Sequence, residues 1–155
     1  MKNIILIALT LLLLVWQKPS FGQSETTMQD IMETLSSKVT ELEDEKDQEI
    51  VNITVDLLVN QGTKSIIRYL DPTFDYMVTA FGDRRISKLK ITAYKKIRDD
   101  WENVNDATGA NPQLNITPSD FDQYRFTVTV EEFKENNTTG HFALLIYHRN
   151  PEKKK

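Results

Sequence analysis

The residues best suited to bind a ligand form a run of positive side chains between Arg84 and Arg98. This stretch contains seven Lys and Arg residues and no acid. Such a stripe can recognise an anionic polymer, a phosphate-bearing surface or an acidic protein. We expect it to have no opposite charge beside it, and any anionic ligand of the domain to meet Arg84, Arg85, Lys88 and Lys90. The favoured interpretation, however, is an ordinary solvated face, balanced by the acidic residues of 41–49.

Acidic side chains crowd the segment that follows this run. Their oxygens are ligands that calcium accepts, but the EF-hand spacing is absent, so a solvated loop is favoured over calcium binding. Two neighbouring carboxylates could instead serve a small hydrolase, although nothing in the sequence nearby provides the burial that raises an acid's pKa. The residues of this group are Asp99, Asp100, Glu102 and Asp106.

Other catalytic patterns are missing from the sequence. A catalytic zinc needs three protein ligands, whereas this chain has no Cys and only His141 and His148. These two lie seven residues apart on one predicted strand and therefore point to opposite faces. There is no Gly-x-Ser-x-Gly motif either. The sequence predicts a non-enzymatic protein without a cofactor.

The first 22 residues have the pattern of a cleaved signal peptide. Lys2 supplies the positive start, Ile4 to Trp16 form the apolar run, and Ser20-Phe21-Gly22 places small residues at a cleavage site before Gln23. The apolar run is shorter than the roughly 20 residues that a membrane-spanning helix needs. We therefore expect a periplasmic, cell-surface or secreted protein without a transmembrane span after cleavage. The absence of Cys and the Gly-Gln cleavage site favour a Gram-negative bacterium.

The composition of the mature chain fits one folded domain of ordinary size. Cleavage removes two lysines and no acid, which changes the formal net charge from −4 to −6. An acidic chain of this size argues against nucleic-acid binding. Without disulfides, an ordinary hydrophobic core has to stabilise it.

Residues 27–47 show the spacing of an amphipathic helix. Apolar residues recur at steps of three and four and share one face. The stripe is too short to argue a coiled coil, so packing against its own domain is favoured, and docking on another protein is the alternative. The stripe consists of Met28, Ile31, Met32, Leu35, Val39 and Leu42.

From Ile50 onward the apolar period changes from helical to alternating, which indicates strands. The first strand should bury Val51, Ile53, Val55, Leu57 and Val59 on one face. Further strands are predicted at 64–70, 75–81, 86–94, 113–116, 124–130 and 141–147, with a polar connection over 95–111. Seven or so strands at this spacing predict a mainly β protein, an antiparallel β-sandwich or jelly roll with an N-terminal amphipathic helix. The domains are then a signal peptide (1–22), a helix and acidic linker (23–49), a β-sandwich (50–149) and a basic tail (150–155).

Several strand sequences resemble the bacterial pre-peptidase C-terminal domain. The similar stretches are 76–83 with its Gly-Asp turn, 89–94, Pro118, 124–130 and 140–144, within a region of about 64–148. The resemblance implies a small extracytoplasmic β-sandwich that acts as an accessory or substrate-contacting module of a secreted hydrolase. Where the family usually carries acids around the Leu after that turn, this chain has Lys88 and Lys90 around Leu89.

Together these patterns predict an exported, non-enzymatic binding or accessory module of a bacterial envelope or secreted system. Its expected partner is an envelope or extracellular protein or an anionic glycan. The alternatives are an assembly component that docks through the N-terminal helix and a small carboxylate-based hydrolase.

The predicted cleavage can be tested on the exported protein. Mass spectrometry of the N-terminus should find a chain that starts at or near Gln23. A mature protein that retains Met1 in a membrane fraction would contradict the signal-peptide prediction.

Overall fold

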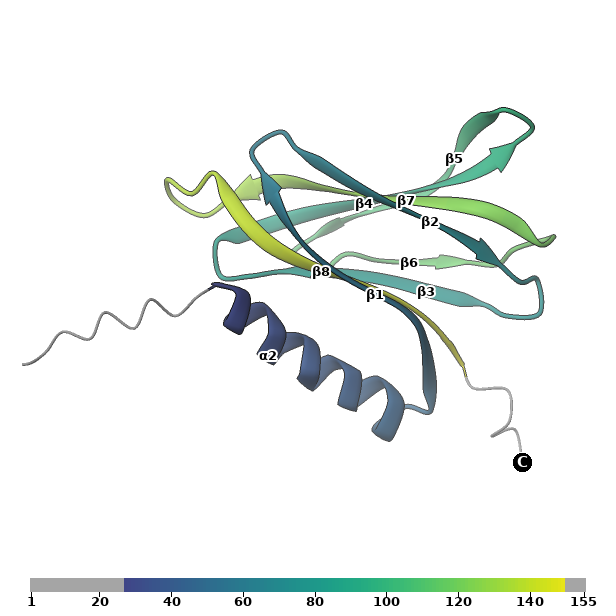
Figure 1. Cartoon of the computed structure of the whole chain (residues 1–155), viewed down its shortest axis with the longest axis horizontal. Helices are drawn as coiled ribbons and strands as arrows, with labels where there is room; N and C mark the ends of the chain where they lie inside the picture. The colour runs from purple at the N-terminus through teal and green to yellow at the C-terminus, as the bar shows by residue number, and fades with distance from the viewer. Residues whose placement is uncertain (1–26, 150–155) are drawn as a thin grey trace, which may run out of the picture.

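The structure, a computed structural model, describes residues 27–149 (Figure 1). The predicted signal peptide (1–22) and basic tail (150–155) lie outside the described residues. Helix α2 spans Thr27–Thr40 and continues as one wider helical turn, η1, over Glu41–Glu45. The strands are β1 (Gln48–Val59), β2 (Thr63–Leu70), β3 (Tyr76–Gly82), β4 (Ile86–Ile97), β5 (Asp100–Gly109), β6 (Gln113–Ile116), β7 (Asp122–Phe133) and β8 (Thr139–Arg149).

The strands form two antiparallel sheets of four. Sheet A has the order β1-β8-β3-β6 and sheet B the order β2-β7-β4-β5. The chain crosses between the sheets at every connection except the β4–β5 hairpin, which gives the double Greek key of a jelly roll. The predicted fold class, a mainly β sandwich or jelly roll with an N-terminal helix, is therefore confirmed. No helix within residues 27–149 has the length and apolar character needed to cross a membrane.

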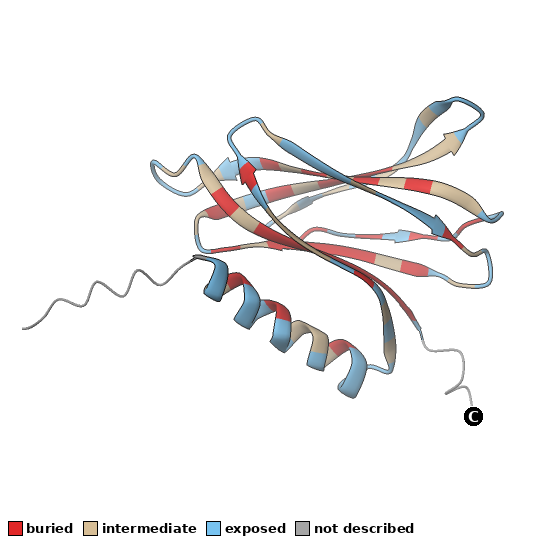
Figure 2. Cartoon of the chain, viewed as in Figure 1, coloured by how far each residue is buried: buried red, intermediate tan, exposed pale blue. Residues whose placement is uncertain are grey.

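Strand β8 lies at the centre of the packing because both of its faces are buried (Figure 2). Phe142, Leu144 and Ile146 point into the core between the sheets. Ala143 and Leu145 point the other way, into a second core beneath helix α2. Residues 27–149 therefore form three layers: helix α2, sheet A and sheet B.

Helix α2 covers the outer face of sheet A. Ile31, Leu35 and Leu42 are buried there, and Val39 is partly buried against the same cluster. The favoured prediction, that the stripe packs on its own domain, is confirmed for these residues, whereas Met28 and Met32 are exposed.

Strand β1 lies where it was predicted, but its facing is the reverse of the prediction. Val51, Ile53, Leu57 and Val59 are exposed, while Asn52 and Leu58 are buried on the inner face. The alternation does mark a strand, but its apolar side is the outer side, beside helix α2. Because β1 is an edge strand, the helix over its neighbour covers this side only in part.

Strand β5 replaces most of the predicted polar connection over 95–111. It pairs with β4 as a hairpin, so the sandwich has eight strands rather than about seven. Edge strands that are exposed on most positions show little apolar alternation, which is why this one escaped prediction. On β7 the predicted burial of Phe126 and Val128 is confirmed.

The helix core offers a direct test of the three-layer arrangement. Leu35→Ala should lower the free energy of unfolding by about 2–5 kcal/mol, because it removes a buried side chain. Met32→Ala, one turn away but exposed, should change it by less than about 0.5 kcal/mol. Urea denaturation of residues 23–155 measures both, and equal effects would contradict the packing of α2 on sheet A.

Candidate functional site

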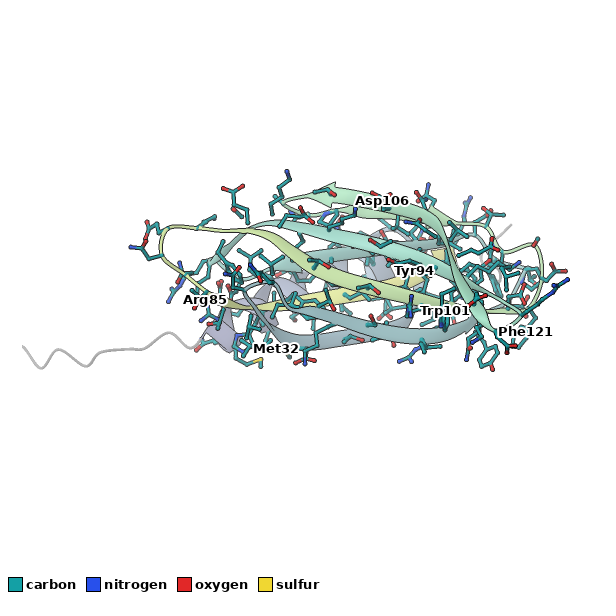
Figure 3. All side chains as sticks on the ribbon, turned by 90° about the horizontal axis from the view of Figure 1, so that it is seen from above. Met32, Arg85, Tyr94, Trp101, Asp106 and Phe121 are labelled. Atoms are coloured by element: carbon teal, nitrogen blue, oxygen red, sulfur yellow. The ribbon has the colours of Figure 1, made fainter. Side chains whose placement is uncertain are left out.

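The outer face of sheet B carries aromatic side chains that no other layer of residues 27–149 covers (Figure 3). They lie there because alternate residues of each strand point outward. The register places Ile67 of β2 opposite Arg125 of β7, and Arg125 opposite Tyr94 of β4. Trp101 of β5 lies opposite Lys96 of β4. Tyr94, Trp101 and Phe121 gather toward the same end of this face in Figure 3.

Arg125 is held between two aromatic rings. Its guanidinium carbon lies 4.5 Å from the centroid of Tyr94 and 4.7 Å from that of Trp101, and the Lys96 ammonium lies 5.3 Å from the Trp101 centroid. Cation–π contacts of this kind contribute about 0.5–2 kcal/mol each. The buried Nε of Arg125 has no hydrogen-bond partner among residues 27–149, and no carboxylate there forms a salt bridge with this side chain. The positive charge is thus held by the rings rather than neutralised.

A second aromatic pair extends the face toward the β2 edge. Tyr69 and Phe121 stack with ring centroids 5.6 Å apart and planes inclined by 10°. Their exposures, 62% and 64%, are the largest among the exposed large hydrophobic side chains of the described region. Large aromatic side chains normally bury much of their area, so this stacked pair is available to a ligand.

We define the aromatic face as Tyr69, Tyr94, Trp101, Phe121 and Arg125. Flat rings can stack on the apolar faces of other rings or of sugars, while guanidinium, ammonium and amide groups donate hydrogen bonds beside them. The face therefore suits a ligand with flat apolar faces and many hydroxyl or anionic groups at its edges.

The predicted basic residues do not form one patch of unopposed charge. Arg85 forms a salt bridge with Asp83, and Lys90 lies 3.6 Å from Asp106. The backbone N–H of Arg84 donates to the Asp30 carboxylate of α2, and Lys88 is exposed. The expectation that no opposite charge lies beside this stripe is therefore wrong, while anion binding at these four residues stays a prediction.

Arg85 belongs to a buried cluster that fastens the β3–β4 turn to β8. The Asp83 carboxylate accepts hydrogen bonds from the Arg85 guanidinium (2.8 Å) and from the backbone N–H groups of Arg85 (2.9 Å) and His141 (2.8 Å). Burial by itself would raise the pKa of Asp83, but these hydrogen bonds outweigh it and hold the pKa below its ordinary value. Asp83 and Arg85 therefore serve the fold.

The acidic residues proposed for calcium or hydrolysis do not converge. Asp99 and Asp100 are exposed at the β4–β5 turn, and Glu102 and Asp106 are exposed along β5. Within residues 27–149 no three His, Asp or Glu side chains lie close enough to hold a metal ion. The structure does not assemble a metal site from Asp99, Asp100, Glu102 and Asp106.

A cavity of about 310 Å³ lies between helix α2 and the β3–β6 side of sheet A. Its wall includes Lys38 and Glu41, together with Gln113 of β6. Hydrogen bonds from Lys38 and Lys46 lower the pKa of Glu41 to about 2. Because Glu41 already has two ammonium partners, this cavity presents no unpaired carboxylate to a ligand.

The aromatic face was missed in the sequence for one main reason. Trp101 lay in a segment that was predicted as a polar connection and not as a strand. Its pairing with β4, which brings it to Arg125, could therefore not be predicted. The available signal was the alternation of Arg125 with buried Tyr124 and Phe126, which does predict an outward arginine on β7.

No known protein family and no curated protein sequence matches the chain. Several solved structures have a similar fold at low identity. The Yersinia pseudotuberculosis-derived mitogen has a TM-score of 0.49 at 8% identity, covering 69% of this chain and 91% of its own. Aeromonas hydrophila PliG, a periplasmic inhibitor of g-type lysozyme, has a TM-score of 0.46 at 7% identity, and the alignment covers 63% of this chain and 85% of PliG. These similarities indicate no shared function, and the resemblance to the pre-peptidase C-terminal domain stays a prediction.

The Asp83 cluster predicts how stability depends on pH. Because the pKa is lowered in the folded state, the carboxylate stabilises the protein above its unfolded pKa of about 4, and this contribution disappears as the pH falls through the folded pKa. Asp83→Asn should therefore unfold more easily than the wild type at pH 7 and lose less stability on acidification. Urea denaturation between pH 7 and pH 2 measures this, with exposed Asp99→Asn as the control. Parallel pH curves for wild type and Asp83→Asn would contradict the role of this carboxylate.

Proposed function

We propose that this protein is an exported, non-enzymatic binding module that recognises a glycan chain through the aromatic face of sheet B. The observation that carries the proposal is the combination of an exposed aromatic stack, Tyr69 and Phe121, with an arginine that lacks a carboxylate partner. Sugar rings present C–H faces to aromatic rings and hydroxyl or carboxylate groups to donors. The jelly-roll fold is compatible with a non-enzymatic accessory β-sandwich and also occurs in lectins. Because fold does not imply function, the proposal rests on this face.

The chemistry of the face favours a ligand over a substrate. Arg125, Lys96 and the four rings bind and orient groups, but none is an acid–base pair placed to transfer a proton. Lys95, which points to the other side of β4, is already engaged by Asp122 at 2.6 Å, and this hydrogen bond raises the pKa of Lys95. The donors free to meet a glycan are therefore those on the outer face.

Export is part of the proposal because it brings the module to glycans. The support is the sequence of residues 1–22, which has the three regions of a secretory signal peptide. A mature chain of net charge −6 repels an anionic polymer over most of its surface. Such a polymer would therefore bind where positive side chains are concentrated, as Arg125 and Lys96 are on the aromatic face.

Glycan binding can be measured with residues 23–155 on an oligosaccharide array, followed by calorimetry on the best ligand. Trp101→Ala and Tyr69→Ala should each weaken binding about tenfold or more, since anchoring aromatic residues are typical binding hot spots. Val104→Ala is the control, because Val104 is an exposed apolar residue of the same strand that lines a cavity at the β5–β6 edge. It should leave the affinity within about twofold, as a contact outside the binding surface does.

Three outcomes would overturn the proposal. The first is an array without any bound glycan. The second is equal loss of affinity in Trp101→Ala and Val104→Ala. The third is release of shortened oligosaccharides that stops in Asp99→Asn or Asp100→Asn, which would establish the hydrolase alternative instead.

A further inference from the structure

Strand β1 presents a long apolar edge that the sandwich leaves uncovered. It is 12 residues long and pairs with β8 on one side only. On its outer face Val51, Ile53, Leu57 and Val59 are 39–49% exposed. Natural edge strands are usually protected by Lys, Pro, short length, a bulge or an inward charge. The sequence of β1 contains neither Lys nor Pro, its register irregularity lies at its N-terminal end, between Ile50 and Asn52, and its inward Asp56 is paired with Lys64.

We propose that β1 pairs antiparallel with β1 of a second copy of this chain, around a two-fold axis through Val55. An axis at this residue places Ile53 opposite Leu57 and Val51 opposite Val59, so every outer cross-strand pair is apolar. On the inner face it places Asp56 opposite Thr54. Cross-strand pairs of this kind stabilise a sheet, whereas like charges opposite each other destabilise it. The contact is isologous, as closed dimers require.

Other registers are less complementary. A slip of two residues toward the C-terminal end of β1 places the two Asp56 side chains opposite each other. A slip of two residues the other way places Val59 opposite Glu49. A slip of one residue would bring the apolar face of one strand against the inner face of the other. The Val55 register is thus the one in which all five outer residues face apolar partners.

The charges at this edge also suit a buried junction. Asp56 forms a 2.8 Å salt bridge with Lys64 of β2. On the inner side of the same edge, the side-chain amide of Asn52 donates a hydrogen bond to the Thr54 hydroxyl and accepts one from the Arg68 guanidinium. Hydrogen bonding to Lys64 and to the backbone N–H of Leu57 lowers the pKa of Asp56. Pairing of two copies would therefore leave Asp56 with its own cation, Lys64.

Helix α2 completes the surface. The two α2 helices would lie on the same side of the joined sheet, each over its own β8, about three strand spacings or ~14 Å apart. Packed helices lie about 8–10 Å apart, so a narrow strip remains between them. The residues on the other flank of α2, such as Thr34 and Lys38, line the cavity toward β6. Exposed Met28 and Met32 lie on the opposite flank, toward β1, where they would cover this strip.

The register gives a sharp test because the chain has no Cys. In residues 23–155, Val55→Cys places two thiols directly opposite each other, about 4.5–5.5 Å between Cβ atoms, close enough to be oxidised to a disulfide. Ile53→Cys places them four residues out of register, about 13 Å apart, and is the matched control. Oxidation should give a covalent dimer of Val55→Cys and none of Ile53→Cys. Equal cross-linking of both variants, or of neither, would overturn the proposal.

Sedimentation equilibrium of the wild type provides the second measurement. A dimer should form at about 100 μM protein, where mass action favours association. Ile53→Lys with Leu57→Lys should raise the dissociation constant at least about tenfold, because the two positions lie opposite each other across the axis and the variant therefore sets like charges face to face. Ile67→Lys, an equally exposed apolar residue on sheet B, should change it less than about twofold, as a substitution outside the contact does. A wild type that stays monomeric would overturn the proposal, and thermal unfolding confirms that each variant is folded.

Discussion

The apolar character of β8 on both faces is the constraint on which the structure depends. A strand at the middle of a sandwich needs one buried face, but β8 alternates between two sets of apolar side chains and therefore needs a layer on each side. Sheet B covers one face and helix α2 covers the other. This explains why a helix of only 14 residues, in which Ile31 and Leu35 are buried, is part of the fold.

The position of helix α2 over β8 determines which surfaces of the two sheets remain exposed. One helix is wide enough to shield β8 and part of β3, but not the edge strand β1, whose outer apolar row stays in contact with solvent. Within residues 27–149, sheet B has no helix on its outer face, so its outward residues can serve a ligand. The aromatic face and the β1 edge are thus both consequences of placing helix α2 on sheet A. They lie on different sheets, so a ligand on one does not occupy the other.

The sequence predicts most of this architecture because hydrophobic periodicity reports burial. The helix stripe, the alternation over Tyr124 to Val130 and the nearly continuous apolar run of β8 were all interpreted correctly as elements. The facing of β1 was predicted wrongly. Alternation shows that one side of a strand is apolar, but it does not show whether that side faces the other sheet or the helix. The expectation of unopposed charge along the basic stripe was wrong for a related reason: the buried partner of Arg85 is Asp83, two residues away, and only the turn brings the two side chains together. Trp101 and Arg125 are 24 residues apart in the sequence and meet only through the strand register.

Fluorescence of Trp101 tests the central claim most directly. The chain has two tryptophans, Trp16 and Trp101, so a protein that starts at Gln23 reports on Trp101 alone. Titration of this protein with an oligosaccharide that binds it should change the emission saturably, with a midpoint equal to the calorimetric dissociation constant, because the sugar excludes water from the indole. A glycan that binds by calorimetry while the emission of Trp101 stays constant would show that the aromatic face is not the binding site.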